Sequence, residues 1–451
     1  MYLFFTRHFN DIDHIAPIVW KLKKDNYPVA VYCMNPQYDI RSDYRLQFLK
    51  NEGVPVDYLH DAFDQHQGLF HNIMHACMQK CSNLQNRIEG DESGQPGKLL
   101  RMLGPVARRL MSVSYKITRL IYYNNRWARS IIERTGAQVI CFDHIMPKLY
   151  VVDAFLKASR QMSIPSLALP HGVYLYTNEA TKPKATDEHR LAKFNRFDYI
   201  IVTNKLRKAL LAHSGVAEDK IFVLGSARYC GEWLEQNRKI LPGGFDAVSK
   251  ESGKLKVVLM PSKPQCRVDV ERMFSTCRIL ADLEGVEAMI KPHTRLRSEK
   301  HIFDNIPLPD VSSVLTAELC DWADVLINVG SSVITDALMR EKPVLYLKYL
   351  HDNTTLFEEL GACWTIHNED ELKHALGSLK ADKTGVPYGE ANVAKFISEV
   401  VKGGDDSRDV LSTYEQFIVD CARGEHPKQG QIRKNSQPPP PAGKNSVVSV
   451  V

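Results

Sequence analysis

The stretch Ala323–Tyr346, ADVLINVGSSVITDALMREKPVLY, predicts a strand, a loop, a helix and a second strand, in that order. Its first apolar run, Val325–Asn328, is short and bounded by turn residues, as expected of a strand buried on both faces. A helix is expected over Ser332–Arg340, directly after the loop. Strands that alternate with helices in this way are typical of a parallel, doubly wound sheet.

The loop of this unit carries residue types that bind phosphate. Gly330 lets the backbone approach a ligand closely, and Ser331 and Ser332 offer hydroxyl and N–H groups where the helix dipole favours anions. Asp336, one turn into the helix, is a candidate to bind a ribose hydroxyl or to orient a neighbour. The structural alternatives are that Ser331 only caps the helix and that Asp336 is an exposed carboxylate.

The same alternation extends over most of the chain. In the N-terminal half, the expected strands are Tyr2–Thr6, Val29–Cys33, Val54–Tyr58, Ala137–Phe142, Ser166–Leu169 and Tyr199–Val202. In the C-terminal half they are Val257–Met260, Glu287–Ile290, Val311–Leu315, Val325–Asn328 and Val344–Leu347. Further helices are expected over Ile15–Lys24, Val151–Gln161, Asn204–Ser214, Val268–Glu284 and Asp409–Arg423. This pattern predicts an α/β protein with two Rossmann-like doubly wound domains that face a cleft.

Length and a turn-rich break at residues 241–253 indicate two domains. A chain of 451 residues is too long for one ordinary core. We expect an N-terminal acceptor domain over residues 1–228, a C-terminal nucleotide-donor domain over 229–424 and a disordered, proline-rich tail over 425–451. Open α/β sheets bind ligands beyond the carboxyl ends of their strands, so the chemistry is expected in the cleft.

The composition is that of a globular protein, with 44% hydrophobic and 25% charged residues. Most of the net charge of +5 lies in the tail, so the body is nearly neutral, which argues against a nucleic-acid-binding surface. The N-terminus does not have the pattern of a signal peptide, and no run approaches the roughly 20 apolar residues of a membrane span. We therefore expect a cytoplasmic protein whose ten cysteines are free thiols.

Residues 93–132 form a basic insertion that does not fit the alternation, because they include eight basic residues and no acidic one. Pro105 can begin a helix in which apolar residues recur at three- and four-residue steps as far as Ile132. One interpretation is a helix packed on the domain with a solvated basic side. The other is an interfacial helix over 105–132 that binds an anionic membrane at the inner face of the cell membrane.

A second candidate for phosphate binding is the sequence IKPHTRLR, which follows an expected strand of the C-terminal half. It places Lys291, His293 and Arg295 at the carboxyl edge of the sheet, where all three could reach a diphosphate. Weaker candidates are Arg228, at the domain junction, and Lys263, after the first strand of the second domain. Loop cations and plain turns are the structural alternatives.

The sequence LALPHGVY places His171 directly after an expected strand of the N-terminal domain. A histidine at that edge, facing the cleft, can accept a proton from an attacking hydroxyl near neutral pH. The alternative is a loop histidine that fixes the turn beside Gly172.

The sequence gives little support for metal or cofactor chemistry. His71 and His75 are one helical turn apart, but Cys77 points away from them, so four zinc ligands do not converge. The phosphate-binding motif of P-loop ATPases, the GxGxxG of standard dehydrogenases and the GxSxG nucleophile elbow are all missing. We therefore expect no metal and no cofactor.

The order of these motifs resembles the bacterial CDP-glycerol glycerophosphotransferases of teichoic-acid synthesis and the wider GT-B transferases of capsule and other surface carbohydrates. The resemblance rests on His171-Gly172, Gly225–Arg228, Pro292-His293-Thr294 and Ser331-Ser332, which occur in the family's order over residues 137–365. Bacterial sialyl- and polysialyltransferases, which use CMP-activated donors, have similar His-Pro and Ser-Ser pairs.

This resemblance implies a role for several residues. His171 would be the general base, His293 would contact the donor phosphates, and Ser331 and Ser332 would bind the nucleotide phosphate. The sequence departs from the family at Pro170, where the family has Trp, at Thr294, where it has Pro, and at Asn328-Val329-Gly330, where it has Thr-Asp-Tyr.

The N-terminus supports a rival resemblance. Thr6-Arg7 followed by Ile15–Val19 is similar to the start of the non-hydrolysing UDP-GlcNAc 2-epimerases, which share the two-domain architecture. Their His-Val-Glu-Ala-Gly segment is missing, and their Ser-Gly-Gly is Gly-Ser-Ser here.

We therefore expect a transferase that moves a glycosyl or glycerophosphate group from a CDP-, CMP- or UDP-linked donor to a cell-surface polysaccharide or lipid-linked acceptor. The alternatives are an epimerase-like nucleotide-sugar enzyme and a non-catalytic nucleotide-sugar-binding subunit. Replacing His171 separates the last from the others, because a binding subunit loses nothing by it.

Overall fold

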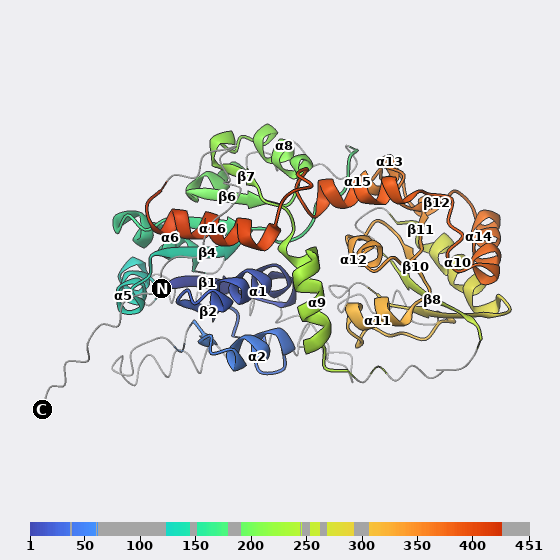
Figure 1. The fold of residues 1–451 in the computed structure, drawn as a ribbon, viewed down its shortest axis with the longest axis horizontal. Helices are drawn as coiled ribbons and strands as arrows, with labels where there is room; N and C mark the ends of the chain where they lie inside the picture. Colours follow the sequence, from blue (N-terminus) through green and yellow to red (C-terminus); the bar gives the residue numbers. More distant parts are fainter. Residues whose placement is uncertain are drawn as a thin grey trace, which may run out of the picture.

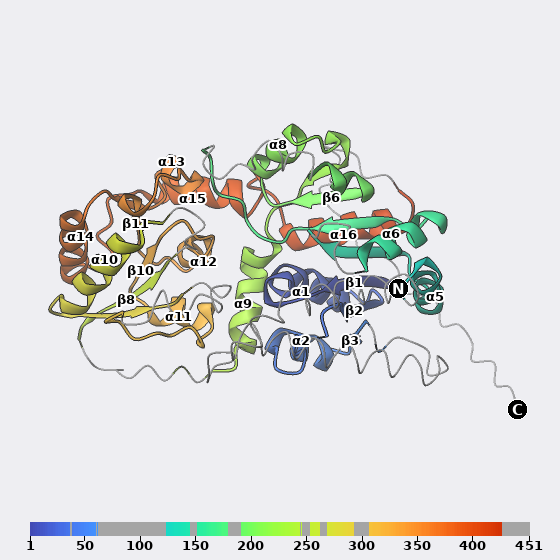
Figure 2. The ribbon, with the colours of Figure 1, turned by 180° about the vertical axis from the view of Figure 1, so that it is seen from behind.

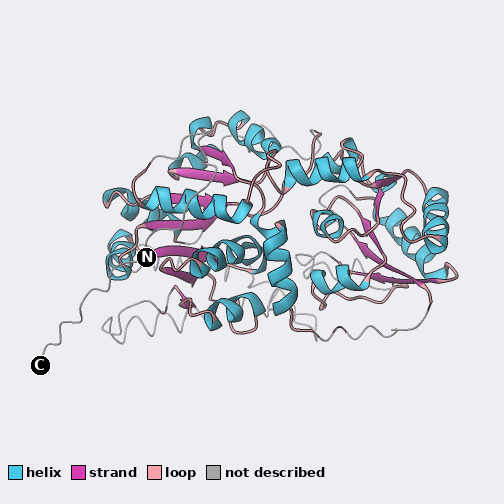
Figure 3. Cartoon of the chain, in the orientation of Figure 1, coloured by secondary structure: helices cyan, strands magenta, loops and turns pink. Residues whose placement is uncertain are grey.

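The computed structural model describes residues 1–36, 38–59, 61, 123–144, 151–178, 191–243, 245, 253–261, 268–292 and 306–425. These residues form two parallel β-sheets, each with helices on both faces (Figure 1, Figure 3). Helix α9 (Gly231–Ile240) stands between the two sheets when the molecule is seen from either side (Figure 2). The predicted α/β class with two Rossmann-like doubly wound domains is confirmed.

The N-terminal sheet has the strand order β3-β2-β1-β4-β5-β6-β7. Its strands are β1 (Tyr2–Thr6), β2 (Val29–Cys33), β3 (Val56–Tyr58), β4 (Val139–Asp143), β5 (Ser166–Leu169), β6 (Tyr199–Val202) and β7 (Ile221–Val223). All neighbouring pairs are parallel. Strands β1, β2, β5 and β6 have the predicted bounds. Each is a short apolar run, buried on both faces, that ends where the polar or turn residues begin.

Helices cover both faces of this sheet and bury its apolar side chains. Its helices are α1 (Phe9–Lys24), α2 (Tyr44–Asn51), α5 (Asn125–Thr135), α6 (Val152–Gln161) and α8 (Lys205–His213). The core between the sheet and α1 includes Phe4 and Ile15, while the core on the opposite face includes Phe5 and Phe155. Both faces are therefore dry, and polar groups can meet a ligand only at the ends of the strands.

The C-terminal sheet has the strand order β12-β11-β10-β8-β9. Its strands are β8 (Leu255–Met260), β9 (Val286–Ile290), β10 (Val325–Asn328), β11 (Val344–Leu347) and β12 (Trp364–Ile366), and all neighbours are parallel. Its helices are α10 (Val270–Asp282), α11 (Thr316–Trp322), α12 (Ile334–Met339), α13 (Leu356–Glu359), α14 (Glu369–Ala381) and α15 (Glu390–Val400).

The predicted strand Val311–Leu315 is wrong. Only an isolated bridge joins Asp310 to Ile290 of β9, and the chain then turns. The turn is held by side chains, because Asp310 accepts a hydrogen bond from the Ser312 N–H at 2.7 Å and Lys291 donates to the carbonyl of Val314. Side-chain bonds of this kind compete with a regular ladder.

The last helix, α16 (Val410–Ala422), returns to the N-terminal domain rather than ending the C-terminal one. It packs beside α1, and Tyr414 and Phe417 lie in the N-terminal core (Figure 1). Helix α9 also contributes Trp233 to that core. The sequence-based division at residue 228 therefore needs correction: the packing assigns α9 and α16 to the N-terminal domain.

The described end of the basic insertion is a packed helix. Asn124 caps α5 by accepting hydrogen bonds from two N–H groups of its first turn, so the single predicted helix over 105–132 is interrupted there. Trp127 and Ile131 are buried, while Arg126 and Arg129 are exposed. Over 125–132 the packed interpretation therefore holds, and residues 93–122 lie outside the described ranges. Within those ranges, every helix is too short or too polar to cross a membrane.

Candidate active site

Four charged side chains meet where three neighbouring strands of the N-terminal sheet end. Strands β1, β4 and β5 are adjacent, so the loops that follow them lie side by side. Arg7 and Asp11 come after β1, Asp143 is the last residue of β4, and His171 follows β5. We call Arg7, Asp11, Asp143 and His171 the acid–base cluster.

Short contacts hold this cluster together. His171 Nδ1 lies 3.0 Å from Asp11 Oδ1 and 3.0 Å from Asp143 Oδ2. Arg7 Nε donates to Asp11 Oδ2 at 3.1 Å, and the same guanidinium contacts Asp143. Both carboxylates are fully buried, whereas 28% of the His171 side chain is exposed. The imidazole is therefore the member of this carboxylate–histidine contact that a substrate reaches most directly.

The two carboxylates decide the protonation of the histidine. Burial alone would lower the pKa of His171, but the contacts with Asp11 and Asp143 outweigh burial and raise that pKa above its ordinary value. Burial and the neighbouring Asp11 carboxylate raise the pKa of Asp143 to about 6. Although burial acts in the opposite direction, His171 and Arg7 hold the pKa of Asp11 below its usual range. The cluster is thus built to stabilise a positive imidazolium.

Two further histidines lie close by: His8 directly precedes α1, and His14 lies within it. His8 Nδ1 is 3.2 Å from Asp11 Oδ1, and its ring centroid is 5.7 Å from that of His171. His14 is buried, and burial together with the charge of Arg228 lowers its pKa well below the ordinary value. His14 is therefore neutral near physiological pH.

The same residues have the donor set for a divalent cation. One ligand atom each from Asp11, Asp143 and His171 lies within 4.8 Å of the others. However, the guanidinium of Arg7 already contacts both carboxylates and supplies the positive charge that a metal would bring. The arrangement therefore supports acid–base chemistry more directly than metal binding.

Arg228, predicted to contact the donor, joins helix α1 to the domain junction. Its Nη1 lies 2.9 Å from Asp13 Oδ2. Burial would lower the pKa of Arg228, but the Asp13 carboxylate outweighs it and raises that pKa. The turn that holds Arg228, Ala227–Tyr229, also contacts α12. Arg228 is thus at the interface between the domains, with its charge already compensated.

The predicted phosphate loop has the expected turn but a shorter helix. Gly330 has φ +81°, which L side chains rarely adopt, and Ser331 N–H donates to Asn328 Oδ1 at 2.7 Å. Ser331 Oγ accepts a hydrogen bond from the Val333 N–H at 3.4 Å, but the N-cap of α12 is Val333, which makes no side-chain cap bond, so Ser331 does not cap the helix as the structural alternative expected. Helix α12 begins at Ile334 rather than at Ser332, because residues 331–335 first form tighter turns.

The His171 loop and the Gly330 loop are tied together across the interface. Five residues after His171, Tyr176 donates a hydrogen bond from its hydroxyl to the carbonyl oxygen of Gly330 at 2.8 Å. A Cβ on Gly330 would lie 3.0 Å from that hydroxyl, so glycine is needed for this approach as well as for the turn. Thr177 N–H donates to the Thr354 carbonyl nearby at 2.9 Å. Strand β5 and strand β10 therefore present their loops to one shared region.

Two other predicted donor contacts are engaged within the C-terminal domain. Lys291 is buried, and its Nζ donates to the carbonyls of Ser312 and Val314. Burial lowers the pKa of Lys291 to about 8. Asp336 is also buried, rather than exposed, and accepts a hydrogen bond from Arg340 Nε at 2.7 Å. Lys291 and Asp336 thus stabilise the fold around the loop, whatever else they bind. His293, Arg295 and Lys263 lie outside the described residues.

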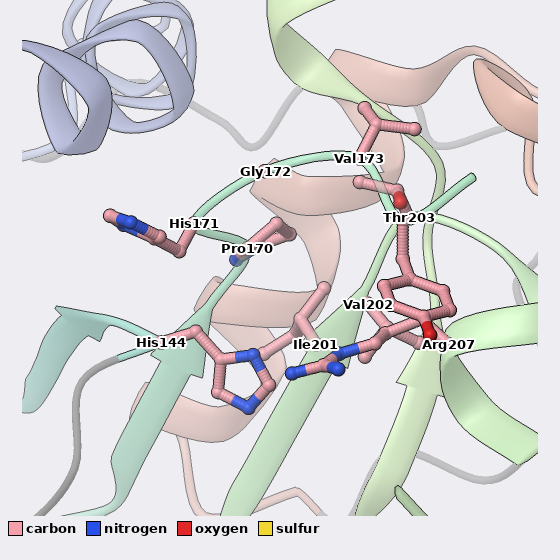
Figure 4. A pocket seen from close by; sticks show the side chains of 10 residues that line it. His144, Pro170, His171, Gly172, Val173, Ile201, Val202, Thr203 and Arg207 are labelled. Carbon is pink, nitrogen blue, oxygen red and sulfur yellow. The ribbon is translucent and has the colours of Figure 1, made fainter. Parts of the chain in front are cut away.

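A pocket of about 190 Å³ opens on the other side of the His171 loop. It is lined by His144, Pro170, His171, Gly172, Val173, Tyr174, Ile201, Val202, Thr203 and Arg207. Figure 4 shows the His144 ring and the Arg207 guanidinium turned toward each other, whereas His171 projects away from both. The His171 loop thus separates the acid–base cluster from this pocket.

Sequence reasoning missed most of the partners of His171. It gave Asp143 and Arg207 no role. Asp143 could have been recognised as a candidate, because it directly follows the buried apolar run VICF and a carboxylate is rarely buried for structural reasons. The contact with His171 could not be predicted, since it depends on β4 lying between β1 and β5.

Comparison with known proteins supports the fold. No protein-family model matches the sequence, and no curated protein matches it. A UDP-N-acetylglucosamine 2-epimerase from Rickettsia bellii is similar in structure, with a TM-score of 0.52 and 10% identity over 94% of this chain and 96% of that one. A Listeria monocytogenes protein assigned as a UDP-N-acetylglucosamine 2-epimerase gives 0.51 and 14% over 94% and 95%. At these identities the likeness shows the two-domain GT-B fold and nothing further.

Proposed function

We propose that the protein is a transferase that moves a glycosyl or glycerophosphate group from a CDP-, CMP- or UDP-linked donor to a polysaccharide or lipid-linked acceptor. The observation that carries this proposal is the Tyr176–Gly330 hydrogen bond, which ties the loop of a buried acid–base histidine to a glycine–serine loop of the other domain. An acid–base group and a phosphate-competent loop on facing domains are the two parts that this chemistry requires.

In this mechanism, His171 takes the proton of the attacking acceptor hydroxyl. Its Nδ1 is turned to Asp11 and Asp143, so proton exchange with the acceptor uses Nε2. The acceptor oxygen forms the new bond to the transferred group, and the bond to the donor's phosphate oxygen breaks with its electron pair. The carboxylates stabilise the imidazolium that results. Ser331 and Ser332 would stabilise the leaving nucleotide by hydrogen bonds, with His293 as a further candidate.

A second candidate function is epimerisation of a nucleotide sugar, which the two fold neighbours favour. Two carboxylates beside His171 could also move a proton at a sugar carbon. Incubation with UDP-GlcNAc in D₂O and without acceptor separates the two functions. An epimerase incorporates deuterium at C2 of the sugar, whereas a transferase leaves the sugar unlabelled and needs an acceptor for turnover.

The phosphate loop gives a direct binding test. We expect Ser331→Ala/Ser332→Ala to weaken binding of the cognate nucleotide by about 1–3 kcal/mol, because charge-assisted hydrogen bonds to its phosphate are lost. Isothermal titration with UDP, UMP, CDP and CMP measures the effect. Ser313→Ala, an exposed serine of the same domain, is the matched control and should bind as the native protein does. Unchanged affinity in the double variant would remove the serines from the site.

The membrane interpretation stays a prediction for residues 105–122, which lie outside the described ranges, and no longer applies to 125–132, whose apolar side is packed on the domain. If the basic segment binds anionic membrane, sedimentation with anionic liposomes should fall steeply as salt increases, because salt screens surface attraction. Equal partition onto neutral and anionic liposomes at low salt would rule out this surface as the reason for binding.

A further inference from the structure

The pocket beside the His171 loop is built from the carboxyl ends of three strands and the start of one helix. His144 follows β4, Tyr174 belongs to the loop after β5, Thr203 follows β6, and Arg207 lies in the first turn of α8 (Figure 4). We call these four residues the Arg207 pocket. They lie on the acceptor side of the proposed enzyme, in the domain that carries His171.

Arg207 has a charge that the described protein does not compensate. Its guanidinium carbon lies 5.4 Å from the centroid of the Tyr174 ring, but the guanidinium forms no ion pair or side-chain hydrogen bond with the residues the structure describes. Among the described residues that line the pocket, none is acidic. Burial lowers the pKa of Arg207, and the one described residue that acts in the opposite direction is Tyr174. Burying a cation without a counter-anion costs folding free energy, so a residue of this kind rarely serves to stabilise the fold.

Three more polar atoms of the pocket lack partners among the residues that the structure describes. His144 Nε2, the Tyr174 hydroxyl and Thr203 Oγ1 are buried, and none has a hydrogen-bond partner within the described part of the chain. More than nine in ten buried polar groups in native proteins are paired. Burial, followed by the charge of Arg207, lowers the pKa of His144 well below its ordinary value, so its ring is neutral and can still donate or accept. Four groups in one pocket without a partner among the described residues indicate a ligand rather than four separate defects.

The chemistry of these groups specifies the ligand. A guanidinium presents two parallel N–H donors that match the oxygens of a carboxylate or phosphate, and the two hydroxyls and the imidazole can each donate one more bond. The pocket, at about 190 Å³, is smaller than the roughly 300 Å³ or more of typical whole-ligand sites, so it accommodates a group rather than a nucleotide sugar.

We propose that the Arg207 pocket binds an anionic oxygen group, a phosphate or a carboxylate, of the acceptor substrate. The assignment to the acceptor rests on the proposed transferase function, whereas anion binding by the pocket does not. Besides these four residues, the pocket is lined by Pro170, His171 and Gly172 of the loop that carries the acid–base histidine. A molecule whose anionic group binds in the pocket therefore has to extend across this loop to bring its hydroxyl to the His171 ring on the other side. Arg207 is thus a specificity-determining residue that selects charged acceptors.

Titration with inorganic phosphate and with acetate tests the proposal and separates the two sources of the anionic group. The full chain is compared with Arg207→Met, at constant ionic strength set with chloride. We expect one of the two anions to bind, and Arg207→Met to weaken that binding by about ten- to a hundredfold, the scale of charge-assisted hydrogen bonds. Arg278→Met removes an exposed charge from α10 and should bind the anion as the native protein does.

Thermal unfolding distinguishes a ligand-binding arginine from a structural one. Without anion, Arg207→Met should melt at the same or a higher temperature than the native protein, because an unpaired buried charge is replaced by an apolar chain of similar length. A large fall in melting temperature for Arg207→Met alone, or anion affinity equal to that of the native protein, would overturn the proposal.

A parallel titration with UDP and CDP separates this proposal from the proposed function. Nucleotide affinity that is unchanged in Arg207→Met supports an acceptor subsite. If nucleotide and anion affinity fall together, the pocket belongs to the donor and the acceptor assignment is wrong. If no nucleotide binds but Arg207→Met still loses the anion, the anion site stands and the transferase does not.

Discussion

Replacing His171 by alanine is expected to lower kcat by about 10²–10⁴-fold, the contribution of a positioned general base. Affinity for the nucleotide donor should change little, because the proton transfer belongs to the transition state. His171→Asn keeps a hydrogen bond but not useful basicity, and should be nearly as inactive. Steady-state kinetics with separate donor titration measure both quantities. His374→Ala, an exposed histidine on α14, is the matched control.

The dependence of activity on pH gives this prediction a signature that a structural histidine lacks. A base works when deprotonated, so activity should rise as pH increases through the pKa of His171. Since the contacts with Asp11 and Asp143 raise that pKa, the rise should occur above pH 6.5, the ordinary histidine value. Asp143→Asn removes one carboxylate, lowers the pKa of His171 and should move the rise to lower pH. Full turnover in His171→Ala, or an unmoved profile in Asp143→Asn, would contradict the role of His171.

The Gly225→Ala variant is expected to lose about 3 kcal/mol of stability or more, the sum of left-handed backbone strain and overpacking. Gly225 has φ +89°, and an added Cβ would lie 2.2 Å from the carbonyl oxygen of Val401. That carbonyl accepts a hydrogen bond from Ser226 N–H at 2.7 Å, and the Tyr414 hydroxyl donates to the Gly225 carbonyl at 2.9 Å. The substitution therefore pushes away the segment that returns α16 to the N-terminal domain.

Thermal or urea unfolding measures this loss of stability, and Gly136→Ala is the control. Gly136 also has a positive φ, +59°, but the space around it is open, with no described atom within 4 Å of an added Cβ. Gly136→Ala should therefore show only the backbone strain, about 1–2 kcal/mol. Equal stability losses in the two variants would mean that the contact with Val401 does not hold the C-terminal segment in place.

The sequence was sufficient for elements that depend on local burial and insufficient for those that depend on tertiary neighbours. Strands β1 and β10 were predicted with their observed bounds, since each is a short apolar run between turns. Strand β7 was missed, because it has only three residues. Helix α16 was predicted but placed in the C-terminal domain, because it follows that domain in the chain; its packing in the N-terminal core is visible only in the fold.

The residues of the candidate site also divide into those that a local sequence pattern indicates and those that depend on the fold. His171 could be predicted because a histidine after a buried strand, followed by glycine, is a local pattern. The contacts of His171 with Asp11 and Asp143 exist because β4 lies between β1 and β5 in the sheet. The sequence does not give this strand order, because parallel strands connected through helices can be arranged in several orders. Arg207 looked like any basic residue in the first turn of a helix, and only the unpaired atoms around it distinguish it.

We propose that the C-terminal domain holds a nucleotide while His171 of the N-terminal domain acts as the base. A thermal-shift panel of CMP, CDP, UMP, UDP and GDP, run on the native protein, His171→Ala and Ser331→Ala/Ser332→Ala, tests it most directly, because a ligand that binds the native state raises the melting temperature. A cytidine or uridine nucleotide should raise it equally in the native protein and His171→Ala, and much less in the double serine variant. If none of the nucleotides raises the melting temperature of the native protein, the claim is wrong.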